Sequence, residues 1–134
     1  MIFLDTNIIL RFVLQDHPIY SKKAANIFAQ IDRGKIRIYL SWLVIFEAVF
    51  VLQNSHKLSK TEITEKLFPM LLLKNILFEN KDLLKTTFEY YVDRNISFAD
   101  AYHAALMAKK KIKEIYSFDR DFDKFPQIRR LENP

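Results

Sequence analysis

The 134-residue sequence contains a single glycine, Gly34, and no cysteine. Glycine-rich phosphate-binding loops and dinucleotide-binding fingerprints need several glycines at fixed positions, so these nucleotide sites are excluded. Without cysteine, the chain can form neither a disulfide framework nor a thiolate metal site. Together with the lack of a signal-peptide pattern, this composition predicts a protein of the reducing cytoplasm.

Long hydrophobic runs are also missing. The most apolar stretch, residues 41–52, is too short to span a bilayer and is interrupted by Glu47, so we expect no membrane partner. Hydrophobic residues make up 50% of the chain and 12 residues are phenylalanine, which provides material for a core and argues against disorder. The length and composition predict one domain over residues 1–134.

The formal net charge is +5. A basic surplus favours a polyanionic partner such as RNA, but surpluses of this size are also common in proteins that never bind nucleic acid. Charge alone therefore leaves the partner open.

Apolar segments of two kinds alternate along the chain. Segments with strand character lie at residues 1–4, 35–41, 75–79, 115–118 and 127–131. Segments with helical periodicity lie at residues 8–14, 19–32, 42–54, 61–73, 82–94 and 98–110. This alternation predicts an α/β fold, a parallel β-sheet of about five strands with helices on both faces.

Several local features can be predicted from single residues. The apolar run 1–4 indicates a first strand buried on both faces, and Asn7 is placed to cap the following helix. Pro69 predicts a kink or break in helix 61–73. The alanine-rich helix 98–110 is expected to pack closely against the sheet, because small side chains permit close approach.

Four carboxylates stand out by their positions. Asp5 and Asp119 directly follow apolar strand segments, where ligands bind in parallel α/β sheets. Asp100 lies in the first turn of helix 98–110 and can aim at the strand ends. Glu47 is the only ionisable residue in the apolar segment 42–52, and we expect it to be paired or metal-bound because burying a lone carboxylate is costly.

Each of these carboxylates also has an ordinary interpretation. Asp5 could cap a helix, and Asp100 fits a capping box that begins at Ser97. Glu47 could form a salt bridge or lie exposed, and Asp119 could belong to a solvated acidic turn with Asp121 and Asp123.

Converging carboxylates repel one another unless cations lie between them. Oxygen-only ligands suit Mg²⁺ or Mn²⁺. The three histidines (His17, His56 and His103) are scattered, so a zinc site is not supported, and His103 is expected to be a packing or surface residue.

With these residues in view, the chain resembles PIN-domain ribonucleases of the VapC toxin type. The resemblance is carried by four motifs in the family's order and spacing, FLDTNIILRFVLQD (3–16), FE (46–47), SFADAYHAALMA (97–108) and IYSFDRDFDKF (115–125). It implies a PIN-like parallel sheet sandwich and an acidic quartet of catalytic, metal-binding residues: Asp5, Glu47, Asp100 and Asp119. Thr6 and Asn7 would support Asp5, and Asp121 is the alternative to Asp119 as the fourth acid.

The same resemblance implies an activity and partners. The chain would be an Mg²⁺- or Mn²⁺-dependent endoribonuclease that leaves a 5′-phosphate and a 3′-hydroxyl, inhibited by a cognate antitoxin and often a homodimer. Basic residues could hold the RNA backbone, or form an ordinary solvated surface; they are Arg11, Lys109, Lys110, Lys111 and Arg120.

Three other classes of protein share some of these features. A haloacid-dehalogenase-type phosphatase needs a second aspartate where this chain has Asn7. A phosphoacceptor receiver domain needs an aspartate at the end of the third strand, and segment 75–79 offers none. A non-catalytic RNA-binding or regulatory module that kept the fold is disfavoured by the intact acids and remains the alternative.

Overall fold

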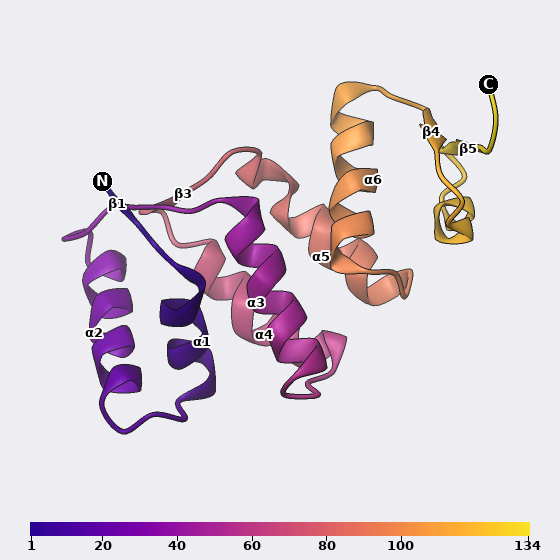
Figure 1. The fold of residues 1–134 in the computed structure, drawn as a ribbon. Coiled ribbons are helices and arrows are strands. Elements are labelled where there is room, and N and C mark those ends of the chain that lie inside the picture. The colour runs from indigo at the N-terminus through magenta and orange to yellow at the C-terminus, as the bar shows by residue number, and fades with distance from the viewer. The chain divides into compact units, whose positions relative to one another are not determined.

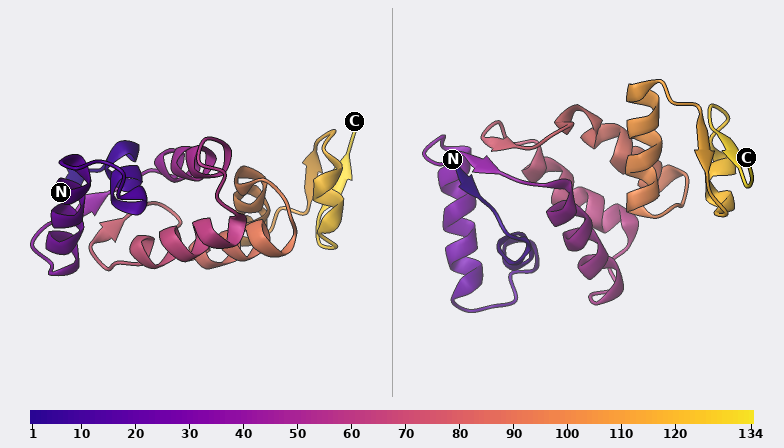
Figure 2. Two further views of the ribbon diagram at one scale, coloured as in Figure 1. Left: turned by 90° about the horizontal axis from the view of Figure 1, so that it is seen from below. Right: turned by 45° about the horizontal axis from the view of Figure 1, so that its top comes forward.

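The structure, a computed structural model, describes all 134 residues. The chain forms two compact units, residues 1–81 and residues 82–134 (Figures 1 and 2). Each unit combines helices with parallel strands. None of the helices has the length and apolar character needed to cross a membrane. That the two units fold as one domain stays a prediction.

The first unit contains a three-stranded parallel sheet in the order β1-β2-β3. Its elements are β1 (Ile2–Phe3), α1 (Thr6–Leu14), α2 (Tyr20–Asp32), β2 (Ile38–Tyr39), α3 (Trp42–Asn54), α4 (Lys60–Leu71) and β3 (Ile76–Leu77). Ile2 pairs with Ile38, which in turn pairs with Ile76. Each parallel connection is made by a helix pair, α1 and α2 and then α3 and α4, as Figure 1 shows.

The core of the first unit lies between its helices. Helix α1 contacts both α2 and α3, and α3 contacts α4. Ile9, Ile31, Leu52 and Leu67 are almost fully buried there. Trp42, the only tryptophan, is also buried, and its indole Nε1–H donates a 2.6 Å hydrogen bond to the carbonyl of Glu79.

The second unit pairs two helices with a small parallel sheet. Its elements are α5 (Leu84–Asp93), α6 (Phe98–Lys110), β4 (Glu114–Tyr116), the 3₁₀ turn η2 (Arg120–Lys124) and β5 (Arg129–Leu131); the 3₁₀ turn η1 (Lys81–Leu83) lies at the junction of the units. Strands β4 and β5 pair in parallel. Buried rings of Phe88 and Tyr91 on α5 pack against Phe98 of α6, with centroid separations of 5.0 and 5.4 Å.

The predicted fold class is confirmed, because all strand pairs are parallel and helices connect them. Two helices have the predicted bounds, α3 and α6. Both begin after a serine whose hydroxyl accepts a hydrogen bond from a first-turn backbone N–H, Ser41 from Val44 and Ser97 from Asp100. These N-caps are the local signal that sets the helix start.

The strands differ from the prediction. All five are present, but they are only two or three residues long and divide into a sheet of three and a sheet of two. The expectation that the first strand is buried on both faces is wrong. Strand β1 is the edge strand of its sheet, and Ile2 and Phe3 are 57% and 59% exposed.

Three further local predictions have different outcomes. Asp5, not Asn7, caps α1, since its carboxylate accepts from the Thr6 backbone N–H. Pro69 does not break α4, because it lies in the last turn of a helix that continues to Leu71, and the alternative of a kink stays a prediction. Within its unit, helix α6 packs on α5 with Ala101 and Ala104 buried, and its close packing against the sheet stays a prediction.

Candidate metal-binding site

In the first unit, Thr6 joins two of the predicted acids. Asp5 follows β1 and its Oδ1 accepts a 2.8 Å hydrogen bond from the backbone N–H of Thr6. The Thr6 hydroxyl donates a 2.9 Å hydrogen bond to Oε2 of Glu47 on α3. Thr6 is only 4% exposed, so packing fixes the positions of its backbone N–H and its hydroxyl. The structure thus brings together residues that are 41 positions apart in the chain, Thr6 and Glu47, beside Asp5.

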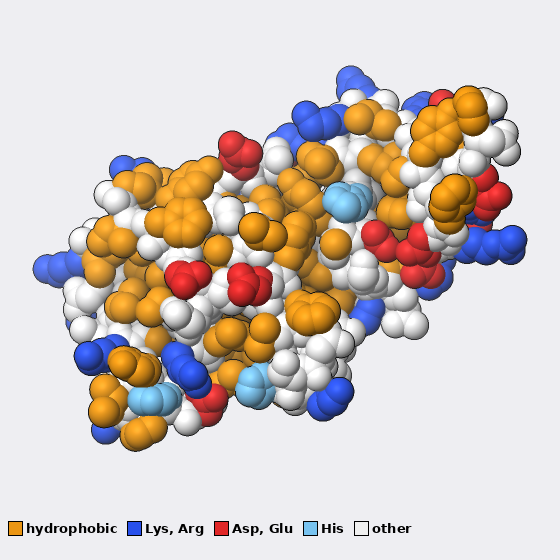
Figure 3. All heavy atoms as spheres, in the orientation of Figure 1, with side chains coloured by type: hydrophobic (Ala, Val, Ile, Leu, Met, Phe, Trp, Pro, Cys, Tyr) orange, Lys and Arg blue, Asp and Glu red, His pale blue; other side chains and the backbone are white.

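Glu47 is not buried, contrary to the reasoning that its apolar neighbours would enclose it. Helix α3 buries one face, with Ile45, Ala48 and Leu52, and presents the other to solvent. On the solvent face Leu43 is 72% exposed, and Glu47 itself is exposed. Figure 3 shows acidic side chains among hydrophobic ones at the surface over α1 and α3. The alternative of an exposed Glu47 is the correct one, with a threonine hydroxyl as its partner.

Asn7, predicted to support Asp5, lies exposed in the first turn of α1. It lines a hollow between α1 and α2 rather than contributing the cap. Of the two residues expected to support Asp5, Thr6 is therefore the one that contacts it.

In the second unit, three carboxylates form a cluster: Asp100, Asp119 and Asp121 each place one oxygen within 4.8 Å of the others. Asp100 comes from the first turn of α6, where its N–H donates to Ser97 Oγ at 3.1 Å. Asp119 begins η2, and its Oδ1 accepts a 2.8 Å hydrogen bond from the Asp121 N–H. The cluster therefore combines carboxylates from two segments, the start of α6 and the start of η2.

The electrostatics of this cluster suit a cation. Burial raises the pKa of the Asp100 carboxyl above its ordinary value, a hydrogen bond from Ser97 opposes the rise, and the negative charge of Asp119 adds to it. A positive ion would remove the repulsion between these carboxylates. Asp121 already has a cationic partner, Lys124, at 3.1 Å.

The donor set fits a hard divalent cation. All three groups offer oxygen, and no histidine or cysteine joins them. Mg²⁺ binds oxygen at about 2.1 Å, so two oxygens on one ion lie up to about 4 Å apart. The carboxylates, within 4.8 Å of one another, could reach this spacing by small side-chain rotations. His103, on the same helix as Asp100, is exposed, as predicted for a surface residue.

The ion pair between Lys124 and Asp121 was not predicted from the sequence. Lys124 lies three residues after Asp121 and neutralises that carboxylate in the same 3₁₀ turn. The i, i+3 spacing of opposite charges in a turn is the signal that could have identified it. Asp121 is thus paired with a cation, and the choice of Asp119 over Asp121 as the fourth acid stays a prediction.

Two of the basic residues expected to contact RNA have acidic neighbours. Arg11 forms a 2.9 Å ion pair with Asp16, and Lys109 forms one of the same length with Asp82. Lys110, Lys111 and Arg120 are exposed. Partly exposed ion pairs contribute only about 0–1 kcal/mol, so neither pair prevents a phosphate from competing for the cation.

Comparisons with known proteins agree with the motifs. The family described as "PIN domain" matches residues 2–128. The chain belongs to the PIN-domain family.

Its relatives include two curated bacterial proteins. A VapC ribonuclease of Aquifex aeolicus (strain VF5) is 26% identical over 124 residues, which are 92% of this chain and 91% of the relative. Ribonuclease VapC13 of Mycobacterium tuberculosis is 27% identical over 136 residues, covering 98% and 99%. Among solved structures, Mycobacterium tuberculosis VapC20, described as a sarcin-ricin loop cleaving toxin, is similar over 92% of this chain and 93% of its own, with 23% identity and a TM-score of 0.43.

Proposed function

We propose that this chain is a metal-dependent endoribonuclease and the toxin of a toxin–antitoxin pair. The observation that carries the proposal is the cluster of Asp100, Asp119 and Asp121 oxygens within 4.8 Å in a chain of the PIN-domain family. The names of its relatives, VapC ribonucleases, support RNA as the substrate. The net charge of +5 is consistent with a polyanionic substrate.

The proposed catalytic set comprises four acids. Asp5 and Asp100 would bind Mg²⁺ or Mn²⁺ directly, and Glu47 and Asp119 would act through water or on a second ion. A divalent ion held this way lowers the pKa of a bound water and stabilises the leaving oxygen of a phosphodiester. The residues of this chain supply charge and orientation: Thr6 fixes Glu47, and Ser97 and Asp121 fix Asp100 and Asp119 through backbone and hydroxyl hydrogen bonds.

The proposal extends to partners and location. A toxin of this kind would be inhibited by an antitoxin that covers the acids, would work in the cytoplasm, and would form a homodimer. Size-exclusion chromatography with light scattering would test the dimer.

Cleavage should require a divalent ion and leave defined ends. Purified protein incubated with 5′-labelled single-stranded RNAs is expected to cut with Mg²⁺ or Mn²⁺ and not with EDTA, because the carboxylates alone cannot activate water. The products should carry 5′-phosphate and 3′-hydroxyl ends, read by their susceptibility to ligation and to phosphatase. Metal-independent cleavage with 2′,3′-cyclic phosphate ends would contradict the proposed chemistry. RNA binding with no cleavage would favour the non-catalytic alternative.

Thr6→Val tests the link between Asp5 and Glu47. Valine keeps the shape of the buried side chain but removes the hydroxyl that donates to Glu47. Residues that orient metal-site ligands typically account for about 10–100-fold in activity, so we expect a loss of about tenfold. Unfolding free energy should change by no more than about 1–2 kcal/mol. Thr6→Ser, which retains the donor, is the control, and a Thr6→Val enzyme as active as Thr6→Ser would show that the hydroxyl has no part in the reaction.

A further inference from the structure

A hollow of about 430 Å³ lies between α1 and α2 in the first unit. Asn7, Ile8 and Arg11 line it from α1, and Tyr20, Lys23 and Ile27 line it from α2. The two charged side chains in this lining, Arg11 and Lys23, are both basic. The hollow begins two residues after Asp5, and two residues span at most about 7 Å. It is therefore adjacent to one of the proposed catalytic acids.

An exposed aromatic side chain stands at the hollow. Tyr20 is 56% exposed, and its ring stacks on His17 with the centroids 4.5 Å apart and the planes 27° from parallel. The ammonium of Lys23 lies 5.8 Å from the centroid of the Tyr20 ring. A partly exposed aromatic ring beside a basic side chain offers a surface on which a nucleic-acid base can stack.

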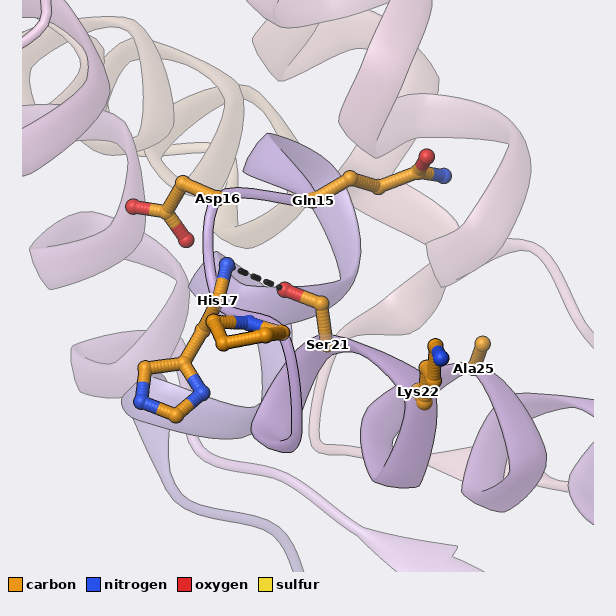
Figure 4. A pocket seen from close by; sticks show the side chains of 7 residues that line it. Gln15, Asp16, His17, Ser21, Lys22 and Ala25 are labelled. Carbon is orange, nitrogen blue, oxygen red and sulfur yellow. Dashed lines mark hydrogen bonds between the residues drawn. The ribbon is translucent and has the colours of Figure 1, made fainter.

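The stacked rings are held in place by the loop before α2. The Nδ1 atom of His17 accepts hydrogen bonds from the backbone N–H groups of Ile19 and Tyr20, at 3.2 and 2.9 Å. The backbone N–H of His17 donates to the hydroxyl of Ser21 at 3.2 Å, as Figure 4 shows. With His17 tied on both sides, the ring of Tyr20 rests on a fixed partner, which lowers the entropy cost of stacking a ligand there.

The two cations of the hollow differ in their surroundings. Arg11 is held by both carboxylate oxygens of Asp16, at 2.9 and 3.1 Å. Its guanidinium also lowers the pKa of the Asp16 carboxyl, so the pair stays ionised at neutral pH. Lys23 is exposed and lies over the tyrosine ring. A phosphate beside a base stacked on Tyr20 would therefore meet Lys23 first.

We propose that this hollow is a subsite for one unpaired nucleotide of the RNA, with the base stacked on Tyr20 and a neighbouring phosphate at Lys23. Aromatic stacking beside a basic side chain is how proteins hold single-stranded nucleic acid without reading its sequence. The subsite rests on the proposed nuclease function and adds to it. The enzyme selects single-stranded RNA because a paired base cannot enter the hollow.

The test is RNA binding, measured separately from cleavage. Fluorescence anisotropy of a labelled single-stranded RNA in EDTA gives the affinity of wild type, Tyr20→Leu, Tyr20→Phe and Lys23→Gln. Stacking on an aromatic is worth about 1–3 kcal/mol per base, so Tyr20→Leu should bind about 5–150-fold more weakly, and Tyr20→Phe close to wild type. Lys23→Gln should weaken binding and lower the number of counterions released on binding, read from the salt dependence of the affinity, by about one.

Lys22→Gln is the matched control, because it removes the same charge from the neighbouring position of α2 and Lys22 does not line this hollow. It should bind RNA nearly as wild type does. If the protein cuts RNA with metal but Tyr20→Leu and Lys23→Gln bind RNA as well as Lys22→Gln does, the subsite is overturned. The proposed nuclease function would then still stand. The subsite would also be overturned if both variants bound RNA normally but lost binding to a partner protein. A wild type that never cleaves, with binding weakened only by Tyr20→Leu and Lys23→Gln, would overturn the nuclease and support the subsite.

Discussion

Asp100→Asn should reduce metal-dependent RNA cleavage by at least about a hundredfold. The substitution keeps the size of the side chain and the backbone N–H that donates to Ser97, but it removes the negative charge that we propose binds the cation. Mutating a residue that only orients a metal ligand typically lowers activity about 10–100-fold, and mutating a direct ligand should lower it at least as much. Single-turnover cleavage of labelled RNA in Mn²⁺ measures the effect.

The same variant should fold at least as well as wild type when no metal is present. Burial and Asp119 raise the pKa of Asp100, so ionising this carboxyl costs folding free energy. Wild type loses that increment of stability as the pH rises from the ordinary value of 3.8 through the raised pKa of the folded state, and asparagine avoids the loss. Added Mn²⁺ should raise the melting temperature of wild type and leave that of Asp100→Asn unchanged.

Asp93→Asn is the matched control, since Asp93 is an exposed aspartate at the end of α5 and lies outside the cluster. It should cleave at the wild-type rate. An Asp100→Asn protein that cleaves within about threefold of Asp93→Asn would contradict the assignment of Asp100 as a metal ligand, and a large loss of stability would contradict the account of its pKa.

Phe88→Ala should destabilise the whole chain by about 3–5 kcal/mol. Phe88 is 2% exposed and packs on Phe98 in the second unit, and truncating a buried phenylalanine leaves a cavity of this cost. We propose that residues 1–134 unfold as one domain. The fluorescence of Trp42, the sole tryptophan and a residue of the first unit, should therefore shift to lower denaturant together with the far-UV circular dichroism.

Glu89→Ala, at the next position of α5, is the control. Its side chain is exposed and forms only a 3.8 Å surface ion pair with Lys85, so the cost should stay below about 1 kcal/mol. If Phe88→Ala moved the circular dichroism transition to lower denaturant while the Trp42 fluorescence transition stayed at the wild-type denaturant concentration, the two compact units would be independent domains.

The sequence predicted best what local chemistry controls. The serine caps and apolar content of α3 and α6 specified both helices, and the order of strands and helices specified the parallel α/β class. The close pairing of Asp119 with Asp121 is also local, because one backbone N–H bridges them.

Longer-range features could not be predicted from the sequence. The exposure of Glu47 depends on which face of an almost uniformly apolar helix meets α4 and α1, and periodicity carries little information when every face is apolar. The Thr6–Glu47 bond joins side chains on different helices, so no spacing rule indicates it. The edge position of β1 follows from strand order, which the run of apolar residues at 1–4 does not encode.

The central proposal is that Asp5 binds the metal ion of a metal-dependent ribonuclease, and Asp5→Asn tests it most directly. Asp5 caps α1, and asparagine is an equally good N-cap, so the fold should be retained. Cleavage of labelled total RNA or transfer RNA by wild type and Asp5→Asn, each with Mn²⁺ or EDTA, is measured together with Mn²⁺ binding by calorimetry. We expect cleavage to need metal, and both cleavage and Mn²⁺ affinity to be lost in the variant. Metal-dependent cleavage that survives Asp5→Asn, in a preparation free of contaminating nuclease, would contradict the account.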